Sequence, residues 1–126
     1  MTPREDGTFP LLRLRDGRWD EMMRIEADGA FLPVGADLGP DGRLYLLERR
    51  FHGLGGFASR LRRLVLQEGG VAQGETLFQS RPGQFGNLEG LAIWRDGAGA
   101  LRATLISDDN FLPVLGTELV EVRLPD

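Results

Sequence analysis

Two groups of polar side chains bracket a pair of apolar runs in the last third of the chain. They are Asn87 and Glu89 before "LAIW", and Asp108, Asp109 and Asn110 after "ATLIS". If the two runs form an antiparallel hairpin that turns at Asp96-Gly97, the first residue of one strand lies beside the last residue of the next, about 4.8 Å away. We therefore expect both polar groups at one rim of a sheet.

Several carboxylate and amide oxygens on one rim suit calcium, which takes six to eight oxygen ligands, and do not suit metals that prefer imidazole or thiolate. The expected ligands are Asn87, Glu89, Asp108 and Asp109, together with Asp37, which we place at the start of a strand in the preceding unit. The alternative is architectural, because Asp and Asn at strand ends often hydrogen-bond to the backbone of a turn.

The preceding unit offers cationic groups at the corresponding position. Arg49 and Arg50 end its second strand, and His52 lies in the following loop. Two guanidinium groups beside an acidic rim can hold a phosphate between a metal and an arginine fork, and His52 is a candidate general acid. The competing interpretations are a surface ion pair between Glu48 and an arginine, and a loop role for His52. No Gly-x-Ser-x-Gly motif is present, and the spacing does not support a Ser107 triad.

The elements that position these residues are predicted to be strands. Asp-Gly pairs, such as Asp41-Gly42, recur between short apolar segments, and such pairs supply the positive φ that tight hairpin turns need. We expect an all-β chain of about eight or nine strands, with "WDEMMRIEA" a strand although it could pass for a helix. Residues expected in the core are Leu46, Leu91, Ile93, Leu105 and Ile106.

A weak repeat suggests how the strands are grouped. "GRLYLLERRFHGLGGFASRLRRLVL" aligns with "LRATLISDDNFLPVLGTELVEVRL" in its hydrophobic pattern and long loop. A period of roughly 50 to 60 residues is typical of β-propeller blades. The prediction is a partial β-propeller of about two and a half four-stranded antiparallel blades. Its boundaries are about 8–27 for the outer strands of one blade, 33–80 for a full blade and 85–124 for a three-stranded blade. A two-layer sandwich is the alternative.

Composition limits the partners. The 126 residues include 15 arginines against 19 acids, and the net charge of -4 offers no basic field for nucleic acid or an anionic membrane. No apolar run resembles a signal peptide or a membrane span, so we expect a soluble chain. Two and a half blades leave apolar faces uncovered, so we also expect self-association or a missing remainder of the propeller.

The motifs resemble a known family. "FLPVGADLGPDGRLYLLERRF", "HGLGGFASRLRRL", "NLEGLAIWRDGAGALRATLISDDNF" and "TELVEVRLP" are similar to the C-terminal portion of the phytase-like propeller family, which is described by esterase-like activity of the phytase type. The resemblance runs from about Phe31 to the end and covers under half of a closed ring. It implies a β-propeller, bacterial export to the periplasm or beyond, and hydrolysis of a phosphoester or ester.

Two functions from different classes follow. The first is a calcium-assisted phosphoesterase, in which the metal activates water and the arginines neutralise phosphate charge. The second is a non-catalytic module that binds a ligand or a protein at the same rim.

Overall fold

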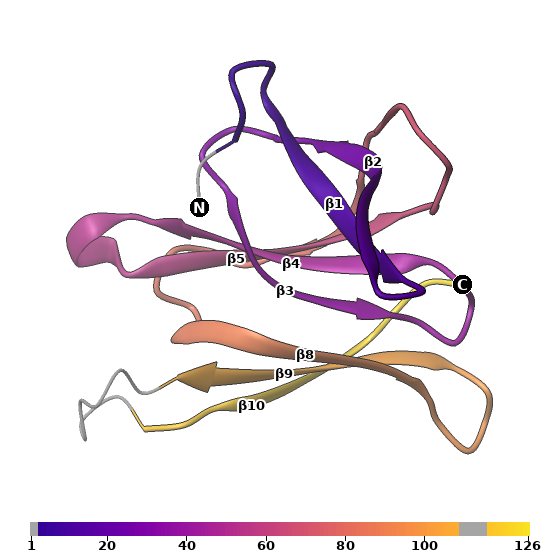
Figure 1. Cartoon of the computed structure of the whole chain (residues 1–126). Coiled ribbons are helices and arrows are strands. Elements are labelled where there is room, and N and C mark those ends of the chain that lie inside the picture. The colour runs from indigo at the N-terminus through magenta and orange to yellow at the C-terminus, as the bar shows by residue number, and fades with distance from the viewer. Residues whose placement is uncertain (1–2, 109–115) are drawn as a thin grey trace.

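The computed structural model describes residues 3–108 and 116–126, and these residues form strands and one short 3-10 helix (Figure 1). The strands are β1 (Thr8–Arg15), β2 (Arg18–Glu26), β3 (Leu32–Leu38), β4 (Leu44–Phe51), β5 (Phe57–Leu64), β6 (Val71–Ala72), β7 (Glu75–Gln79), β8 (Asn87–Arg95), β9 (Leu101–Asp108) and β10 (Leu119–Arg123), and the helix is η1 (Gly53–Gly55). The all-β prediction is confirmed. Within these residues, no helix is long and apolar enough to cross a membrane.

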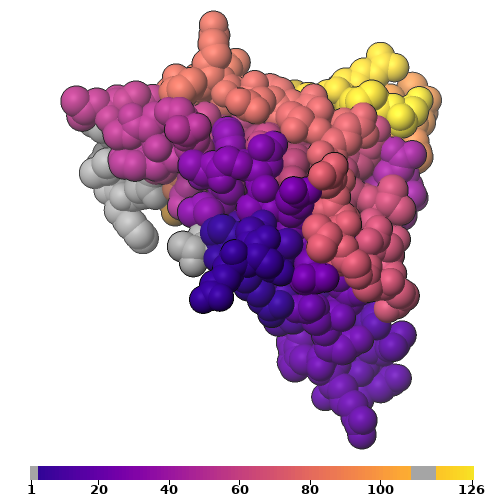
Figure 2. Space-filling view, turned by 90° about the horizontal axis from the view of Figure 1, so that it is seen from above, coloured from indigo at the N-terminus to yellow at the C-terminus, as the bar shows by residue number. Residues whose placement is uncertain are grey.

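The strands form three sheets. Sheet A has the order β1-β2-β6, sheet B the order β3-β4-β5-β7, and sheet C the order β10-β9-β8. The sheets stack as three layers with sheet B in the middle (Figure 1). In the view from above, the indigo to violet N-terminal hairpin of sheet A covers the centre of the molecule (Figure 2). All strand pairs are antiparallel except β2 with β6.

Sheet B is buried on both faces, which explains the absence of polar alternation in "LYLL". Tyr45 and Leu47 on one face of β4 belong to the core shared with sheet C. Leu44 and Leu46 on the other face belong to a second core shared with sheet A. Successive strand residues point to opposite faces, so a strand between two layers buries successive residues, and in "LYLL" all four are apolar. Three layers with two cores exclude the two-layer sandwich, whereas closure into a propeller remains a prediction.

The Asp-Gly pairs lie at the hairpin turns, as predicted. Asp16 and Gly17 both have positive φ, 52° and 73°, and join β1 to β2 directly. Asp41-Gly42 joins β3 to β4. At Asp96-Gly97, between β8 and β9, the positive φ is carried by Gly99 instead.

Two β-bulges meet where sheets B and C touch. The register shifts between Pro33 and Gly35 on β3 and between Leu88 and Gly90 on β8, which makes Glu89 an extra residue in its strand. A Cβ on Gly35 would lie 2.7 Å from the backbone oxygen of Glu89. Glycine at this position therefore lets the two backbones approach, and the bulge redirects the Glu89 side chain.

The predicted core is confirmed in part. Leu46, Ile93 and Leu105 are buried, and Leu91 is half-buried against the core of sheets B and C. The prediction for Ile106 is wrong, because its side chain is 46% exposed on the outer face of sheet C. In β9 alternate residues point away from sheet B, so this apolar side chain has no layer to pack against.

The turn at Asp41 is tied to the core by Tyr45, which donates a hydrogen bond from Oη to Asp41 Oδ2 at 2.7 Å. Burial raises the pKa of Asp41, but this bond and the backbone N–H of Arg43 outweigh it and hold the pKa below its ordinary value. We predict that Tyr45→Phe lowers the free energy of unfolding by about 1–2 kcal/mol at pH 7. A depressed carboxyl pKa stabilises the fold fully above the unfolded pKa of about 3.9, and this contribution is lost as the pH falls through the folded pKa, so the difference should shrink below about pH 4. Urea denaturation at pH 7 and pH 3 measures it, and an equal loss at both pH values would contradict the account.

Candidate functional site

One end of sheets B and C gathers several of the predicted side chains. At this end, here called the rim, β4 and β9 finish and β5 and β8 begin, on the left in Figure 1. Arg49 on β4 donates from Nη1 to Asn87 Oδ1 at 2.5 Å and to Glu89 Oε1 at 3.2 Å. Asn87 Nδ2 donates to the same Glu89 oxygen at 2.9 Å. The rim therefore joins a cation, an amide and a carboxylate from two sheets.

These contacts hold Arg49 in one orientation. Its guanidinium carbon lies 5.0 Å from the centroid of the Phe57 ring, and its side chain is 31% exposed. Within the described part of the chain, no group accepts a hydrogen bond from its Nε or Nη2. Nε and Nη2 form the edge of a guanidinium that binds a carboxylate or phosphate with two parallel hydrogen bonds. Arg49 thus presents an oriented fork for an oxyanion.

A pocket of about 290 Å³ adjoins this cluster. Its lining residues are Gly56, Phe57, Gly83, Gln84, Phe85, Gly86, Asn87 and Glu118. Phe57 and Asn87 contact Arg49 and also line the pocket, so the charged cluster and the pocket are continuous. Sequence reasoning missed the pocket because its walls come from separate loops between strands.

The other predicted residues divide between the two ends of the sheets. The register confirms that Asp108 is paired with Asn87, as the hairpin argument expected. Asp37 is not at this rim: it is the second-last residue of β3, pairs with Tyr45, and its carboxylate accepts the Ile93 N–H at 2.7 Å. The expectation of a common rim is wrong for Asp37, because β3 begins at Leu32 and not at Asp37.

Arg50 and His52 are not brought into the cluster. Arg50 is exposed, and it follows Arg49 in a strand, so its side chain points to the opposite face of sheet B. His52 is exposed in the loop between β4 and β5, where its backbone N–H donates to Gly56 O at 2.8 Å. Asp109 and Asn110 lie outside the described residues.

The charge on Glu89 already has a partner. Arg49 Nη1 lies 3.2 Å from Glu89 Oε1, so the nearest positive group is a guanidinium. In residues 3–108 and 116–126, no three His, Cys, Asp or Glu side chains form a group that could hold a metal ion. Calcium at the rim stays a prediction, and the residues that would hold it in this part of the chain are Asn87, Glu89 and Asp108.

A second charged cluster is buried between sheets A and B. Glu48, 0% exposed, accepts two hydrogen bonds from Arg62, at 2.7 Å from Nε and 2.8 Å from Nη2, and one from Arg60 Nε at 3.0 Å. Arg60 also pairs with Asp28 at 2.8 Å and lies 4.3 Å from the centroid of the Phe31 ring. Glu48 was expected to pair at the surface, if at all, and instead pairs in the core.

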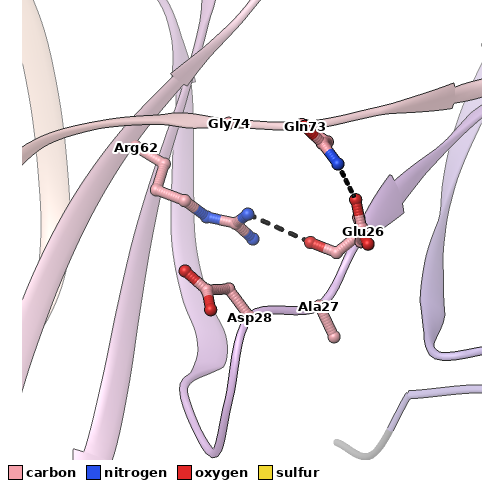
Figure 3. Close-up of a pocket in the computed structure, with 6 residues that line it drawn as sticks. All are labelled: Glu26, Ala27, Asp28, Arg62, Gln73 and Gly74. Atoms are coloured by element: carbon pink, nitrogen blue, oxygen red, sulfur yellow. Dashed lines mark hydrogen bonds between the residues drawn. The ribbon is translucent and has the colours of Figure 1, made fainter.

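Beside this cluster lies a polar pocket of about 250 Å³, lined by Glu26, Ala27, Asp28, Arg62, Gln73 and Gly74 (Figure 3). Arg62 Nη1 donates to the backbone oxygen of Glu26 at 3.0 Å, and Gln73 donates to the Glu26 carboxylate at 2.6 Å. The guanidinium is thus engaged on both sides by protein groups. This cluster therefore joins sheets A and B, and the rim remains the candidate ligand site.

Stacked antiparallel sheets define an all-β protein, and the oriented cation at the strand ends makes the rim its candidate ligand site. The model of the phytase-like family, described as esterase-like activity of phytase, matches residues 7–111. The chain belongs to this family. No curated protein and no solved structure matches it.

Proposed function

We propose that this chain contributes a ligand-binding rim to a phytase-like β-propeller that hydrolyses a phosphoester or ester. The observation that carries the proposal is the orientation of Arg49, whose Nη1 is held by Asn87 and Glu89 while its Nε and Nη2 edge has no described acceptor. A fork held in this way neutralises an oxyanion without reorganising when charge develops on it. Family membership supports hydrolysis. A periplasmic or secreted location stays a prediction from the sequence resemblance.

The chain's own groups supply binding and orientation. Arg49 binds the oxyanion through two parallel hydrogen bonds, and Glu89 and Asn87 fix the plane of the guanidinium. In the non-catalytic alternative, the same contacts bind a ligand that is not hydrolysed. Hydrolysis of 4-nitrophenyl phosphate and 4-nitrophenyl acetate separates the two. We expect turnover above the buffer rate that methyl phosphate inhibits competitively. Binding of methyl phosphate without turnover of either compound would favour the binding module.

Calcium is tested by a separate measurement. The oxygens proposed for it are those of Asn87, Glu89 and Asp108, with Asp109 beyond the described part. Because Glu89 pairs with Arg49, we predict that millimolar calcium leaves the Tm unchanged. A rise in Tm that the double variant Glu89→Gln with Asp108→Asn removes would make calcium the rim's partner and would contradict this prediction.

The outer faces of sheets A and C support the proposal that further sheets cover them, from a second copy or from the rest of a longer polypeptide. The exposed apolar side chains are Leu12, Leu14 and Trp19 on sheet A, and Trp94, Ile106 and Leu119 on sheet C. Exposed apolar faces of this kind favour association. We predict that the 126-residue chain self-associates at micromolar concentration in light scattering. A monomer with a cooperative melt would count against it.

A further inference from the structure

The pocket beside Arg49 is formed by aromatic rings and bare backbone. Phe57 and Phe85 supply the rings, and Gly56 and Gly83 have φ of 80° and 76°. A Cβ on Gly83 would lie 2.9 Å from the backbone oxygen of Gly55, so a side chain would not fit there. Glycine at these positions therefore lets the two loops pack closely against each other, and the pocket surface is mostly apolar. An apolar cavity of about 150 Å³ is large enough for a benzene ring.

The pocket and the oxyanion fork form one continuous surface. The Phe57 ring centroid lies 5.0 Å from the guanidinium carbon of Arg49, and Phe57 also lines the pocket. Asn87 accepts a hydrogen bond from Arg49 and also lines the pocket. Asn87 lies at Nη1, across the guanidinium from the Nε and Nη2 edge, so a ligand on that edge would reach the pocket over the Phe57 ring.

The lining of the pocket includes one carboxylate. Glu118 lines it, and its Oε1 accepts the Gly86 N–H at 2.8 Å. This carboxylate would repel a second anionic group on the same ligand. The pocket is thus suited to a neutral, flat group, and not to a second phosphate.

We infer that the rim binds an amphipathic ligand with a single oxyanionic group, such as one phosphate, on the Nε and Nη2 edge of Arg49 and with a flat apolar group, such as an aryl ring, between Phe57 and Phe85. This inference rests on the proposed oxyanion site and adds the class of its ligand. It predicts that the apolar part of a phosphomonoester contributes to affinity, whereas additional phosphates do not.

Calorimetric titration of the 126-residue chain with methyl phosphate and with phenyl phosphate tests it. We expect phenyl phosphate to bind about tenfold more tightly than methyl phosphate, because half-burying one aromatic ring raises affinity by about that factor. Phe57→Ala should remove this preference, and Phe57→Leu should retain part of it. Phe51→Ala is the matched control: Phe51 is 67% exposed and packs on Phe57, with ring centroids 5.1 Å apart, but does not line the pocket. The Phe51→Ala variant should keep the full preference for phenyl phosphate. Far-UV circular dichroism should show that all three variants fold.

The outcomes separate the two proposals. Equal affinity for both phosphates in the unmodified chain, or a preference that survives Phe57→Ala and Phe57→Leu, would overturn the aryl pocket and leave the oxyanion site standing. Failure of both phosphates to bind would overturn the oxyanion site and the pocket together. Tighter binding of inositol bisphosphate than of phenyl phosphate would also overturn the inferred ligand class.

Discussion

Replacing Glu48 by alanine is expected to lower the free energy of unfolding by about 3–5 kcal/mol, because removing one partner of a buried ion pair leaves an uncompensated buried charge. Glu48 is 0% exposed and accepts hydrogen bonds from Arg60 and Arg62, whose side chains are 4% and 3% exposed. Arg60 would keep its pair with Asp28, whereas Arg62 would keep only its hydrogen bond to the Glu26 backbone oxygen among the described residues. Arg62 is then left without a charged partner in the described part of the chain, so most of the lost stability should come from its uncompensated buried charge.

Urea denaturation followed by circular dichroism measures this change. Glu121→Ala is the matched control, since Glu121 pairs with Arg102 at 3.3 Å on the surface and its side chain is 48% exposed. Exposed pairs of this kind contribute about 0–1 kcal/mol, so the control should melt almost like the unmodified chain. A Glu48→Ala variant as stable as the Glu121→Ala variant would contradict the account.

The second large effect is expected at the rim. Arg49→Met removes the fork and keeps the length of the side chain over the Phe57 ring. We predict that kcat/KM for 4-nitrophenyl phosphate falls about 100-fold or more, the order found when a preorganised donor is removed from a developing oxyanion. Glu89 loses its ion pair with Arg49 in this variant, but the Glu89 side chain is 43% exposed, so the Tm should change little.

Arg95→Met provides the control for charge. Arg95 ends β8 at the opposite end from Asn87, and its Nη1 donates to Gly99 O at 2.9 Å in the turn. Arg95→Met removes the same positive charge far from the rim, so the kcat/KM of this variant should stay within about twofold of the value for the unmodified chain. Equal losses in the two variants would mean that net charge, and not the fork, controls turnover.

Much of the fold follows from local rules in the sequence. Asp16-Gly17 and Asp41-Gly42 form turns because glycine adopts the positive φ that a tight hairpin needs, and the apolar runs between such pairs became strands. The pairing of Asn87 with Asp108 followed from antiparallel geometry alone. These features depend on neighbours close in the chain, so pattern reasoning reaches them.

Features that depend on how sheets stack were not predicted. Pro33 and Gly35 resemble loop residues, so the start of β3 was placed too late and Asp37 at the wrong end. In the structure this segment bulges, and Gly35 admits the backbone of Glu89 from the next sheet. The contact between Arg49 and Glu89 has the same origin, because only packing of sheet B on sheet C brings them together.

The sequence of β5 contains a pattern that indicates the buried charged cluster. Arg60 and Arg62 alternate with apolar residues in a strand of a sheet that is covered on both faces. Two arginines on a covered face require an acid in the same layer, and Glu48 is opposite Arg60 in the register. The pattern therefore predicts the buried cluster once the stacking of the sheets is known.

The central claim is that the Nε and Nη2 edge of Arg49 binds an oxyanion, and the Nε–H resonances of the arginines test it most directly. In the chain labelled with ¹⁵N at arginine, Arg49→Met identifies the Arg49 signal by its loss. On titration with methyl phosphate, the account predicts that this Nε–H signal shifts with the bound fraction and exchanges more slowly with water, while the Arg95 signal stays in place. An Arg49 signal that does not move while methyl phosphate binds, or no binding at millimolar methyl phosphate, would contradict the claim.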